Sequence, residues 1–280
     1  MREIAWNTIR DTVAQLAIRA NTVLDTKVEK AIDQARTTEE SPVGLAILDQ
    51  LLKNSQIARE TATPICQDTG LAVVFVTIGQ EVHITGGSLE EAVHAGVAKG
   101  YTEGYLRKSV VRDPLDRVNT GDNTPAIIHY KIVPGDTLLI TVAPKGIGSE
   151  NMSRIFMLKP SQGLAGIRQA VLDTVLSAGS NACPPLVIGV GVGGNFEKCA
   201  QLAKEALLRP IGQYSQDPAW AQIEKDLLLA VNDLGIGPQG FGGRTTALWL
   251  AVETYPTHIG GMPVAVNINC HVARHESASL

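Results

Sequence analysis

The sequence predicts a mixed α/β protein in which a helical N-terminal layer is followed by a mixed β-sheet flanked by helices. Apolar residues recur at helical spacing through the first sixty positions, whereas β-branched runs bounded by Gly, Pro or Asp begin at residue 71. The chain contains 27 glycines, which indicates many turns where the main chain can approach a ligand closely. No fixed-period repeat or low-complexity tract divides it.

Two helices are expected near the N-terminus. Residues 4–21 place their apolar side chains on one stripe, and residues 41–60 repeat this pattern after a Ser-Pro start. About sixty residues of paired helices bury too little surface to fold alone. We therefore expect one domain over residues 1–280, in which residues 1–61 form a helical lead-in.

The remaining residues alternate between strand and helix patterns. Strands are expected over residues 71–79, 126–133, 136–144 and 185–192, and further apolar runs cover residues 245–253 and 263–269. Helices are expected over residues 89–108, 163–179 and 195–208. The stretch "RPIGQYSQDPAW" that follows the last of these helices is expected to be a loop without a strand.

Charge and composition exclude several classes of function. The net charge is −4 with both signs interspersed, so the sequence offers no basic face for nucleic acid. The charged N-terminus does not resemble a signal peptide, and no run approaches the roughly 20 apolar residues of a membrane span. We expect a cytoplasmic protein with no membrane partner. In a reducing compartment its four cysteines are thiols or metal ligands rather than disulfides, and no CxxC pair is present.

The glycines of "GVGVGGN" allow more than one interpretation. Gly189, Gly191 and Gly194 satisfy G-x-G-x-x-G between an expected strand and an expected helix, as in a dinucleotide-binding turn. That fingerprint also requires a second strand ending in an acidic residue about 20 positions later, and this second strand is missing here. The alternatives are a tight turn from strand to helix, and a helix N-terminus offered to an anion.

The four cysteines differ in their surroundings. Cys199 lies in an amphipathic helical pattern and is expected to be a buried small hydrophobe. Cys66, Cys183 and Cys270 each lie at the edge of an apolar run beside turn residues or polar groups, where a thiolate can face a cavity. Three thiolates from distant segments suit an iron-sulfur cluster with one iron left without a protein ligand. Their separation by itself carries no local signature.

Four polar residues are candidates for the same site. Asp68 follows Cys66 by two residues, so both side chains point to one side of an extended segment, although Asp68 also suits a turn or a helix cap. His258 lies in a loop rich in glycine and proline, which suits a placed acid or base. Arg107 closes an expected helix, and Lys145 lies in a glycine-rich loop after an expected strand. Both could bind an anionic substrate, although exposed Arg and Lys are normally only solvated.

Six ordered motifs together resemble the class I, iron-sulfur fumarate hydratases and the related L-tartrate dehydratases. The motifs are "PICQDTG", "VNTGDNTPA", "APKGIGSENMS", "NACPP", "LGIGPQGFGG" and "PVAVNINC", and the resemblance spans roughly residues 10 to 275. It implies an alpha subunit that acts on a small dicarboxylate. It further implies a hetero-oligomer, in which a beta subunit supplies the proposed base and further cationic residues.

The resemblance also implies roles for individual residues. Cys66, Cys183 and Cys270 would ligate a 4Fe-4S cluster whose open iron acts as a Lewis acid. Gln67 and Asp68 would line the pocket. Arg107 would bind a substrate carboxylate, Gly148 would offer its main-chain N–H to a carboxylate, and His258 would face the site beside Asp68.

The preferred reaction at this stage is the reversible hydration of fumarate to (S)-malate, with L-tartrate dehydration as the alternative. The stretch "KGIGSEN" favours fumarate, because a Gly-Gly-Gly run is expected in this loop of a tartrate dehydratase. The segment "HVARHE" departs from the expected pattern, which leaves His271, Arg274 and His275 without a role. Two other classes stay open: a nucleotide-binding oxidoreductase that uses the glycine turn, and a non-catalytic scaffold subunit.

Overall fold

The computed structural model describes all 280 residues and divides them into two compact units. Unit 1 contains Met1–Leu24, Ser55–Ile147 and Arg274–Leu280, and unit 2 contains Asp25–Asn54 and Gly148–Ala273. Mixed α/β architecture is thus confirmed, with a helix-rich N-terminal part followed by sheets. The single-domain organisation stays a prediction. No helix has both the length and the apolar character needed to cross a membrane.

Unit 1 is built on a four-stranded mixed sheet of order β10-β5-β2-β4. Strand β2 (Leu71–Gly79) runs antiparallel to β5 (Leu138–Lys145) and parallel to β4 (Ile127–Val133), and β10 (Glu276–Ser279) pairs with β5. Helices α1 (Trp6–Thr22) and α4 (Leu89–Glu103) pack together, and their apolar residues share a core with alternate residues of β2 and β5. The alternation explains why these strands are readable from sequence.

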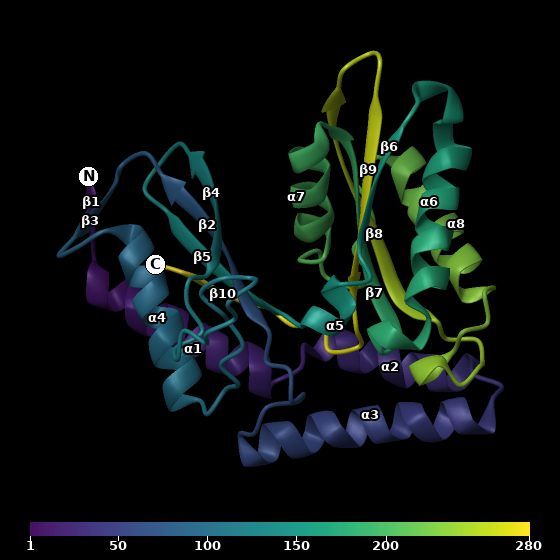
Figure 1. Ribbon diagram of the computed structural model, residues 1–280, viewed down its shortest axis with the longest axis horizontal. Coiled ribbons are helices and arrows are strands. Elements are labelled where there is room, and N and C mark those ends of the chain that lie inside the picture. Colours follow the sequence, from purple (N-terminus) through teal and green to yellow (C-terminus); the bar gives the residue numbers. More distant parts are fainter. The chain divides into compact units, whose positions relative to one another are not determined.

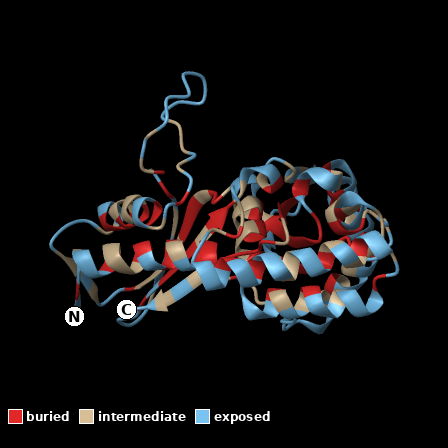
Figure 2. Ribbon diagram, turned by 90° about the horizontal axis from the view of Figure 1, so that it is seen from below, coloured by how far each residue is buried: buried red, intermediate tan, exposed pale blue.

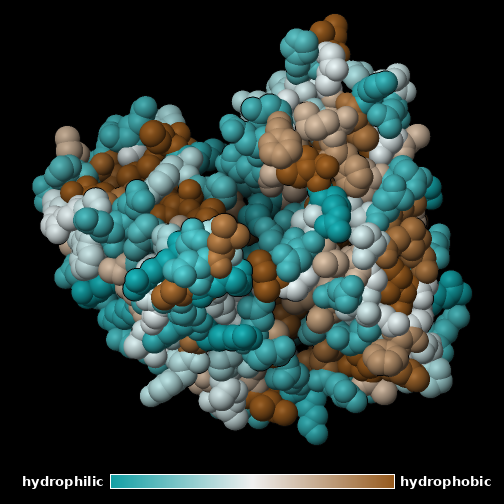
Figure 3. Space-filling model, in the orientation of Figure 1, coloured by the Kyte–Doolittle hydropathy of each residue, from teal (hydrophilic) through white to brown (hydrophobic).

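The outer edge of this sheet is left open. Strand β4 lies at the edge and exposes Ile127, Tyr130 and Ile132. Hydrophobic surface is visible on this unit in the space-filling view of Figure 3. The unpaired main chain and apolar side chains of β4 are therefore both accessible in the isolated chain.

Unit 2 contains a second four-stranded sheet of order β6-β9-β7-β8. Its strands are β6 (Arg154–Leu158), β7 (Leu186–Gly194), β8 (Ala247–Thr257) and β9 (Met262–Asn269). Helix α7 (Phe196–Ala206) covers one face, while α6 (Gly163–Ala178) and α8 (Pro218–Asn232) cover the other (Figure 1). Both faces are therefore buried, as the burial of nearly every residue of β7 and β9 shows, and the helices in Figure 2 each show one exposed side.

The glycines of β7 allow helix α7 to pack unusually close to the sheet. A Cβ atom at Gly191 would clash with the carbonyl oxygen of Cys199, and one at Gly189 would clash with that of Ala203. No second strand lies between α7 and α8, as predicted. The pattern is therefore explained by close packing of a helix on a strand rather than by a bound nucleotide.

Several elements were not predicted. The N-terminus opens with a short strand, β1 (Arg2–Ala5), which pairs with β3 (Val82–Thr85), so the lead-in is not purely helical. Strand β6, strand β10 and helices α2 (Thr26–Thr38) and α8 were also missed. Four- and five-residue strands are too short for periodicity to reveal, because they are specified by pairing with distant partners. The helix expected over 89–108 ends at Glu103.

Two further elements complete the chain. Helix α3 (Pro42–Thr61) follows α2, as expected from the Ser-Pro start. The single-turn helix α5 (Ile147–Glu150) follows β5 and contains Gly148. The boundary between the two units falls within α5, so Ile147 belongs to unit 1 and Gly148 to unit 2.

Candidate functional site

In unit 1 the loop between α3 and β2 carries Cys66, a partly buried free thiol. The main-chain N–H of Asp68 donates to Cys66 Sγ over 3.4 Å, and the thiol lies 3.7 Å from Gln67 Oε1. The sequence "PICQDTG" therefore folds back on its own sulfur atom. This local geometry keeps Cys66, Gln67 and Asp68 together, as the motif predicted.

The carboxylate of Asp68 is fixed by two main-chain donors. Its Oδ1 accepts from the N–H of Gly70 over 3.0 Å, and its Oδ2 accepts from the N–H of Ile147 over 2.8 Å. Gly70 is required here, because its φ is +80° and a Cβ atom would lie 2.7 Å from the main chain of Lys145. Asp68 thus joins the "PICQDTG" loop to the end of β5.

The two predicted anion-binding side chains lie beside this loop. Thr69 Oγ1 accepts from the N–H of Arg107 over 2.9 Å and donates to its carbonyl over 3.2 Å, so the main chain of Arg107 is held while its side chain is exposed. Lys145, the last residue of β5, is only 6% exposed rather than simply solvated. Unit 1 therefore gathers Cys66, Gln67, Asp68, Arg107 and Lys145 into one region.

Arg274 is a further member of this region that sequence reasoning left without a role. Its side chain is 6% exposed, with Nη2 donating to the carbonyl of Asp68 over 2.5 Å and Nε to that of Pro144 over 3.3 Å. Its Nη1 is buried without a hydrogen-bond partner. The sequence offered one signal for a role of Arg274, its position four residues after Cys270. Burial could not be predicted, because exposed and buried arginines look alike in a sequence.

In unit 2, Cys183 lies on the turn between α6 and β7 and is exposed. Its main chain is in the left-handed region, with φ 54° and ψ 64°, and its N–H donates to the carbonyl of Ser180 over 3.0 Å. Gly148 is exposed and lies beside Asn181, two residues before Cys183. Gly148, the predicted N–H donor, therefore lies near the turn that carries the predicted ligand Cys183.

Cys270 directly follows β9, so it lies at the same end of the sheet as Cys183. Strand β7 begins at Leu186, and its residue Val187 pairs with Asn269, the residue before Cys270. His271 continues the contact, because both its N–H and its Nδ1 lie within hydrogen-bonding distance of the Cys183 carbonyl, at 3.4 and 3.1 Å. Two of the three predicted cluster ligands therefore lie at the same end of the sheet.

Cys199 has the opposite environment. It is fully buried in α7, and its thiol donates to the carbonyl of Phe196 over 3.3 Å. Burial raises the pKa of the Cys199 thiol, which disfavours the thiolate needed for metal ligation. The expectation that Cys199 is a small buried hydrophobe is confirmed.

His258 lies at the other end of the unit 2 sheet from the cysteines. Gly194, the last residue of β7, pairs with Thr257, and His258 follows at the tip of the β8–β9 hairpin. The steps from Leu186 to Gly194 correspond to about 26 Å at the strand rise of about 3.3 Å per residue. Within one chain the structure does not bring His258 together with Cys183 and Cys270.

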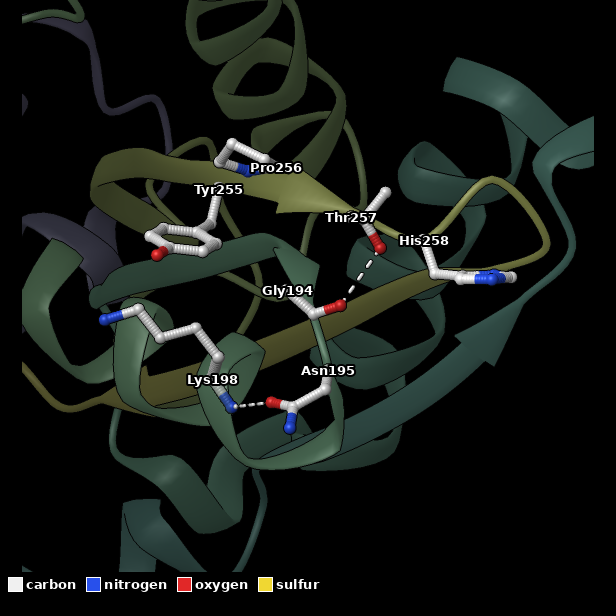
Figure 4. Close-up of a pocket in the computed structure, with 7 residues that line it drawn as sticks. All are labelled: Gly194, Asn195, Lys198, Tyr255, Pro256, Thr257 and His258. Carbon is white, nitrogen blue, oxygen red and sulfur yellow. Dashed lines mark hydrogen bonds between the residues drawn. The ribbon is translucent and has the colours of Figure 1, made fainter.

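His258 lines a shallow pocket of about 460 Å³ at this end. The pocket also contains Asn195 and Lys198 from the start of α7, together with Tyr255 and Thr257 from β8. In Figure 4 the ring of His258 extends away from Lys198, whose ammonium lies 5.3 Å from the centre of the Tyr255 ring. His258 is therefore presented outward on a hairpin.

The donor set fits an iron-sulfur cluster, although the isolated chain gathers no group of three or more His, Cys, Asp or Glu side chains able to hold a metal ion. Three of the cysteines, none of them in a disulfide, lie on loops beside polar main chain, and the fourth is buried in a helix. The unpartnered Nη1 of Arg274 next to the Cys66 loop suits an anionic group such as a thiolate-bound cluster. Cys66 belongs to unit 1, and Cys183 and Cys270 belong to unit 2.

Comparison with known proteins defines the class. Residues 10–279 match the family described as fumarate hydratase (Fumerase), and the chain belongs to this family. The chain is 40% identical over 272 residues to the putative L(+)-tartrate dehydratase subunit alpha of Methanocaldococcus jannaschii, covering 95% of each protein. It is 31% identical over 277 residues to the L(+)-tartrate dehydratase subunit alpha of Escherichia coli K12, covering 98% of this chain and 91% of that protein.

These relatives confirm the predicted family, and they support a different substrate from the one that the sequence analysis preferred. Both are named as tartrate dehydratase alpha subunits, which supports the alternative of the sequence analysis better than its preference for fumarate. The loop "KGIGSEN" was thus a weak guide to substrate. Membership of a hydro-lyase family is established.

Proposed function

We propose that this chain is the alpha subunit of an iron-sulfur L-tartrate dehydratase. The choice of L-tartrate as substrate is supported by 40% identity, across nearly the whole chain, to a protein named as a putative subunit of this kind. The clustering of Cys66, Asp68, Arg107 and Lys145 in unit 1 supports a site for an anionic substrate. Cys66, Asp68 and Lys145 lie within motifs shared with the family, and Arg107 contacts one of them through Thr69.

In this proposal Cys66, Cys183 and Cys270 hold a 4Fe-4S cluster. When bound, the cluster supplies a Lewis acid that assists departure of the substrate hydroxyl group as water. The three thiols are accessible on loops, and each has a neighbouring main-chain donor or acceptor that fixes its segment. Cys199 takes no part.

The other site residues bind and orient the substrate. Arg107 binds one substrate carboxylate, because its exposed guanidinium is planar and its main chain is held by Thr69. Lys145 adds positive charge, and the main-chain N–H of Gly148 donates to a carboxylate. Asp68 and Gln67 line the pocket beside Cys66, and the two main-chain bonds to the Asp68 carboxylate restrict it to one orientation.

A beta subunit completes the enzyme. Both relatives are named subunit alpha, which supports a second polypeptide. The proposed base at the substrate carbon and further cationic residues belong to that polypeptide. We accordingly expect a hetero-oligomer.

His258 acts in this proposal at the cluster of a second copy of the chain. It lies about 26 Å along the sheet from the end that carries Cys183 and Cys270, and this distance exceeds the reach of any side chain. Its outward position on the β8–β9 hairpin suits contact with another chain (Figure 4). His258 is therefore assigned as a catalytic residue donated between copies.

Fumarate hydration is the second candidate, and it is supported by the family match. Tartrate differs from malate by one additional hydroxyl group, so the same carboxylate-binding residues would serve both substrates. A site that hydrogen-bonds a substrate hydroxyl discriminates strongly against the analogue lacking it. The ratio of kcat/KM for the two substrates therefore decides between these functions.

The experiment is anaerobic co-expression with a beta subunit of the same family, followed by kinetics. Dehydration of L-tartrate is followed as oxaloacetate, and fumarate hydration as loss of fumarate absorbance. We expect a higher kcat/KM for L-tartrate than for malate or fumarate, and an air-sensitive brown colour. The reverse ratio favours fumarate hydratase. A colourless preparation that binds NAD(P) would instead support the oxidoreductase interpretation, and a colourless one without activity would support a scaffold.

A further inference from the structure

The residues that follow Cys270 are hydrogen-bonded to both other cysteine motifs. His271 contacts the turn at Cys183 in unit 2, and Arg274 contacts the loop that carries Cys66 in unit 1. We propose that this segment positions the cluster ligands, with His271 fixing Cys183 and Arg274 fixing the Cys66 loop. The inference rests on the proposed function, because it takes these cysteines as cluster ligands.

The turn at Cys183 needs external support. Its φ of 54° is a left-handed conformation that costs a residue other than glycine about 1 kcal/mol or more, so it persists only where its surroundings hold it. The N–H of His271 lies 3.4 Å and its Nδ1 lies 3.1 Å from the Cys183 carbonyl oxygen. With the ring hydrogen on Nδ1, both groups donate to that one oxygen.

Gln239 strengthens the same turn from another segment. Its main-chain N–H and its side-chain Nε2 each donate to the carbonyl of Pro184 over 2.8 Å. Its Nε2 also lies 3.3 Å from Nδ1 of His271. The carbonyl groups of Cys183 and Pro184 are thus held by donors from two distant segments, which leaves the Cys183 side chain as the accessible part of the turn.

Arg274 acts on the residue that contacts the sulfur of Cys66. Its Nη2 donates to the carbonyl of Asp68, whose own N–H donates to Cys66 Sγ. Its Nε donates to the carbonyl of Pro144 in β5, so the guanidinium ties the loop to the sheet of unit 1. These bonds of Arg274 hold the peptide groups of the loop, and thereby the direction in which the Asp68 N–H donates to Cys66 Sγ.

The charge of Arg274 supports a role toward an anion. A guanidinium stays protonated in proteins, and burying it is costly unless an anion is nearby. Both bonds of Arg274 end on neutral carbonyl oxygens, and its Nη1 is buried without a partner. The Asp68 carboxylate is the nearby negative charge, since a Cβ atom at Gly146 would lie 3.4 Å from its Oδ2 and 4.0 Å from Arg274 Nη2. A thiolate-bound cluster at Cys66 would add negative charge on the loop that Arg274 contacts.

The test compares paired variants of the full chain after anaerobic loading with iron and sulfide. His271→Leu removes the ring donor, whereas His271→Asn retains an N–H near the position of Nδ1. Arg274→Met removes the charge and both donors, whereas Arg274→Lys retains the charge. Exposed residues outside the site, in His83→Leu and Arg168→Met, are matched controls. The readouts are the rate of iron release to a chelator, the electron paramagnetic resonance spectrum of the reduced cluster, and the unfolding temperature of the cluster-free chain.

We expect His271→Leu and Arg274→Met each to release iron at least severalfold faster and to alter the spectrum. Asn at 271 and Lys at 274 should restore much of the wild-type behaviour, and both controls should match wild type. Wild-type spectra and iron release in both Leu and Met variants would overturn the proposal. So would a change confined to the unfolding temperature, since that indicates a structural role only.

Two further outcomes are also decisive. If a Leu or Met variant does not fold, His271→Ala or Arg274→Gln takes its place, because each also removes the ring donor or the charge, and wild-type iron release together with a wild-type spectrum in both replacements counts against positioning. If the wild-type chain itself binds no cluster, the proposed function fails rather than this inference.

Discussion

The two ends of the unit 2 sheet differ in how their candidate functional residues are held and exposed. At one end Cys183 and Cys270 follow buried main chain and are surrounded by donors from His271 and Gln239. At the other end His258 lies on an outward hairpin beside a shallow pocket. The rigid strands between them keep the ends about 26 Å apart. This contrast is the basis of our proposal that the first end holds a group within the chain, while the second contacts a neighbouring chain.

The largest effect is expected at the cysteine end. Cys183→Ala should abolish cluster binding and reduce activity to background, because it removes one of three thiolate ligands. Cys199→Ala is the matched control, since Cys199 is a buried thiol bonded only to the Phe196 carbonyl. It should retain iron and activity and lose about 1 kcal/mol of stability. Iron and sulfide analysis and kinetics check both variants, and full activity in Cys183→Ala would remove the basis of the comparison.

The histidine end should affect catalysis without affecting the cluster. His258→Asn should retain iron and lower kcat about 10²–10⁴-fold, the usual contribution of a general acid or base. Co-expression of His258→Asn chains with Cys183→Ala chains should restore part of the activity, because mixed oligomers then contain a site with an intact cluster and an intact histidine. Absence of any recovery in isolated mixed oligomers would place His258 outside the site of a second copy.

Strand β7, which runs between the two ends, packs closely against α7. Gly191→Ala should reduce the free energy of unfolding by about 1–3 kcal/mol, because its methyl group clashes with the Cys199 carbonyl. Gly261→Ala is a suitable control, because a Cβ atom there meets no atom within 4 Å. Denaturant titration measures both variants. Equal stability of the two would contradict the close-packing explanation of the glycine pattern.

The smallest effect concerns Glu39, which supports the chain entering β8 at the cysteine end. Burial alone raises the pKa of this carboxyl, but main-chain donors from Ser41, Arg244 and Thr245 outweigh it and lower the pKa overall. The stabilisation is therefore complete above the unfolded pKa and is lost as the pH falls through the folded pKa. Glu39→Gln should cost about 1 kcal/mol near pH 7, and this difference from wild type should narrow below about pH 4.5. Thermal unfolding across pH checks this, and a constant difference would contradict it.

Much of the candidate site could be predicted because short motifs carry it. "PICQDTG" fixes Cys66, Gln67 and Asp68 by local hydrogen bonds, so their proximity follows from the sequence alone. His258 shows the limit of this reasoning. A separation of twelve residues from Cys270 does not reveal that a full-length strand, β9, carries the two residues to opposite ends of a sheet.

The sequence by itself determined the family, the mixed α/β class, the long helices and the central strands. Periodic burial patterns and short motifs are formed by residues that are close together in the sequence, so they can be recognised without the fold. It also separated Cys199 from the other three cysteines. The tertiary structure alone decided the roles open to His271, Arg274 and Gln239, and the placement of His258. Burial of a guanidinium, support of a left-handed turn and the length of a sheet all depend on residues far apart in the chain, which no local pattern records.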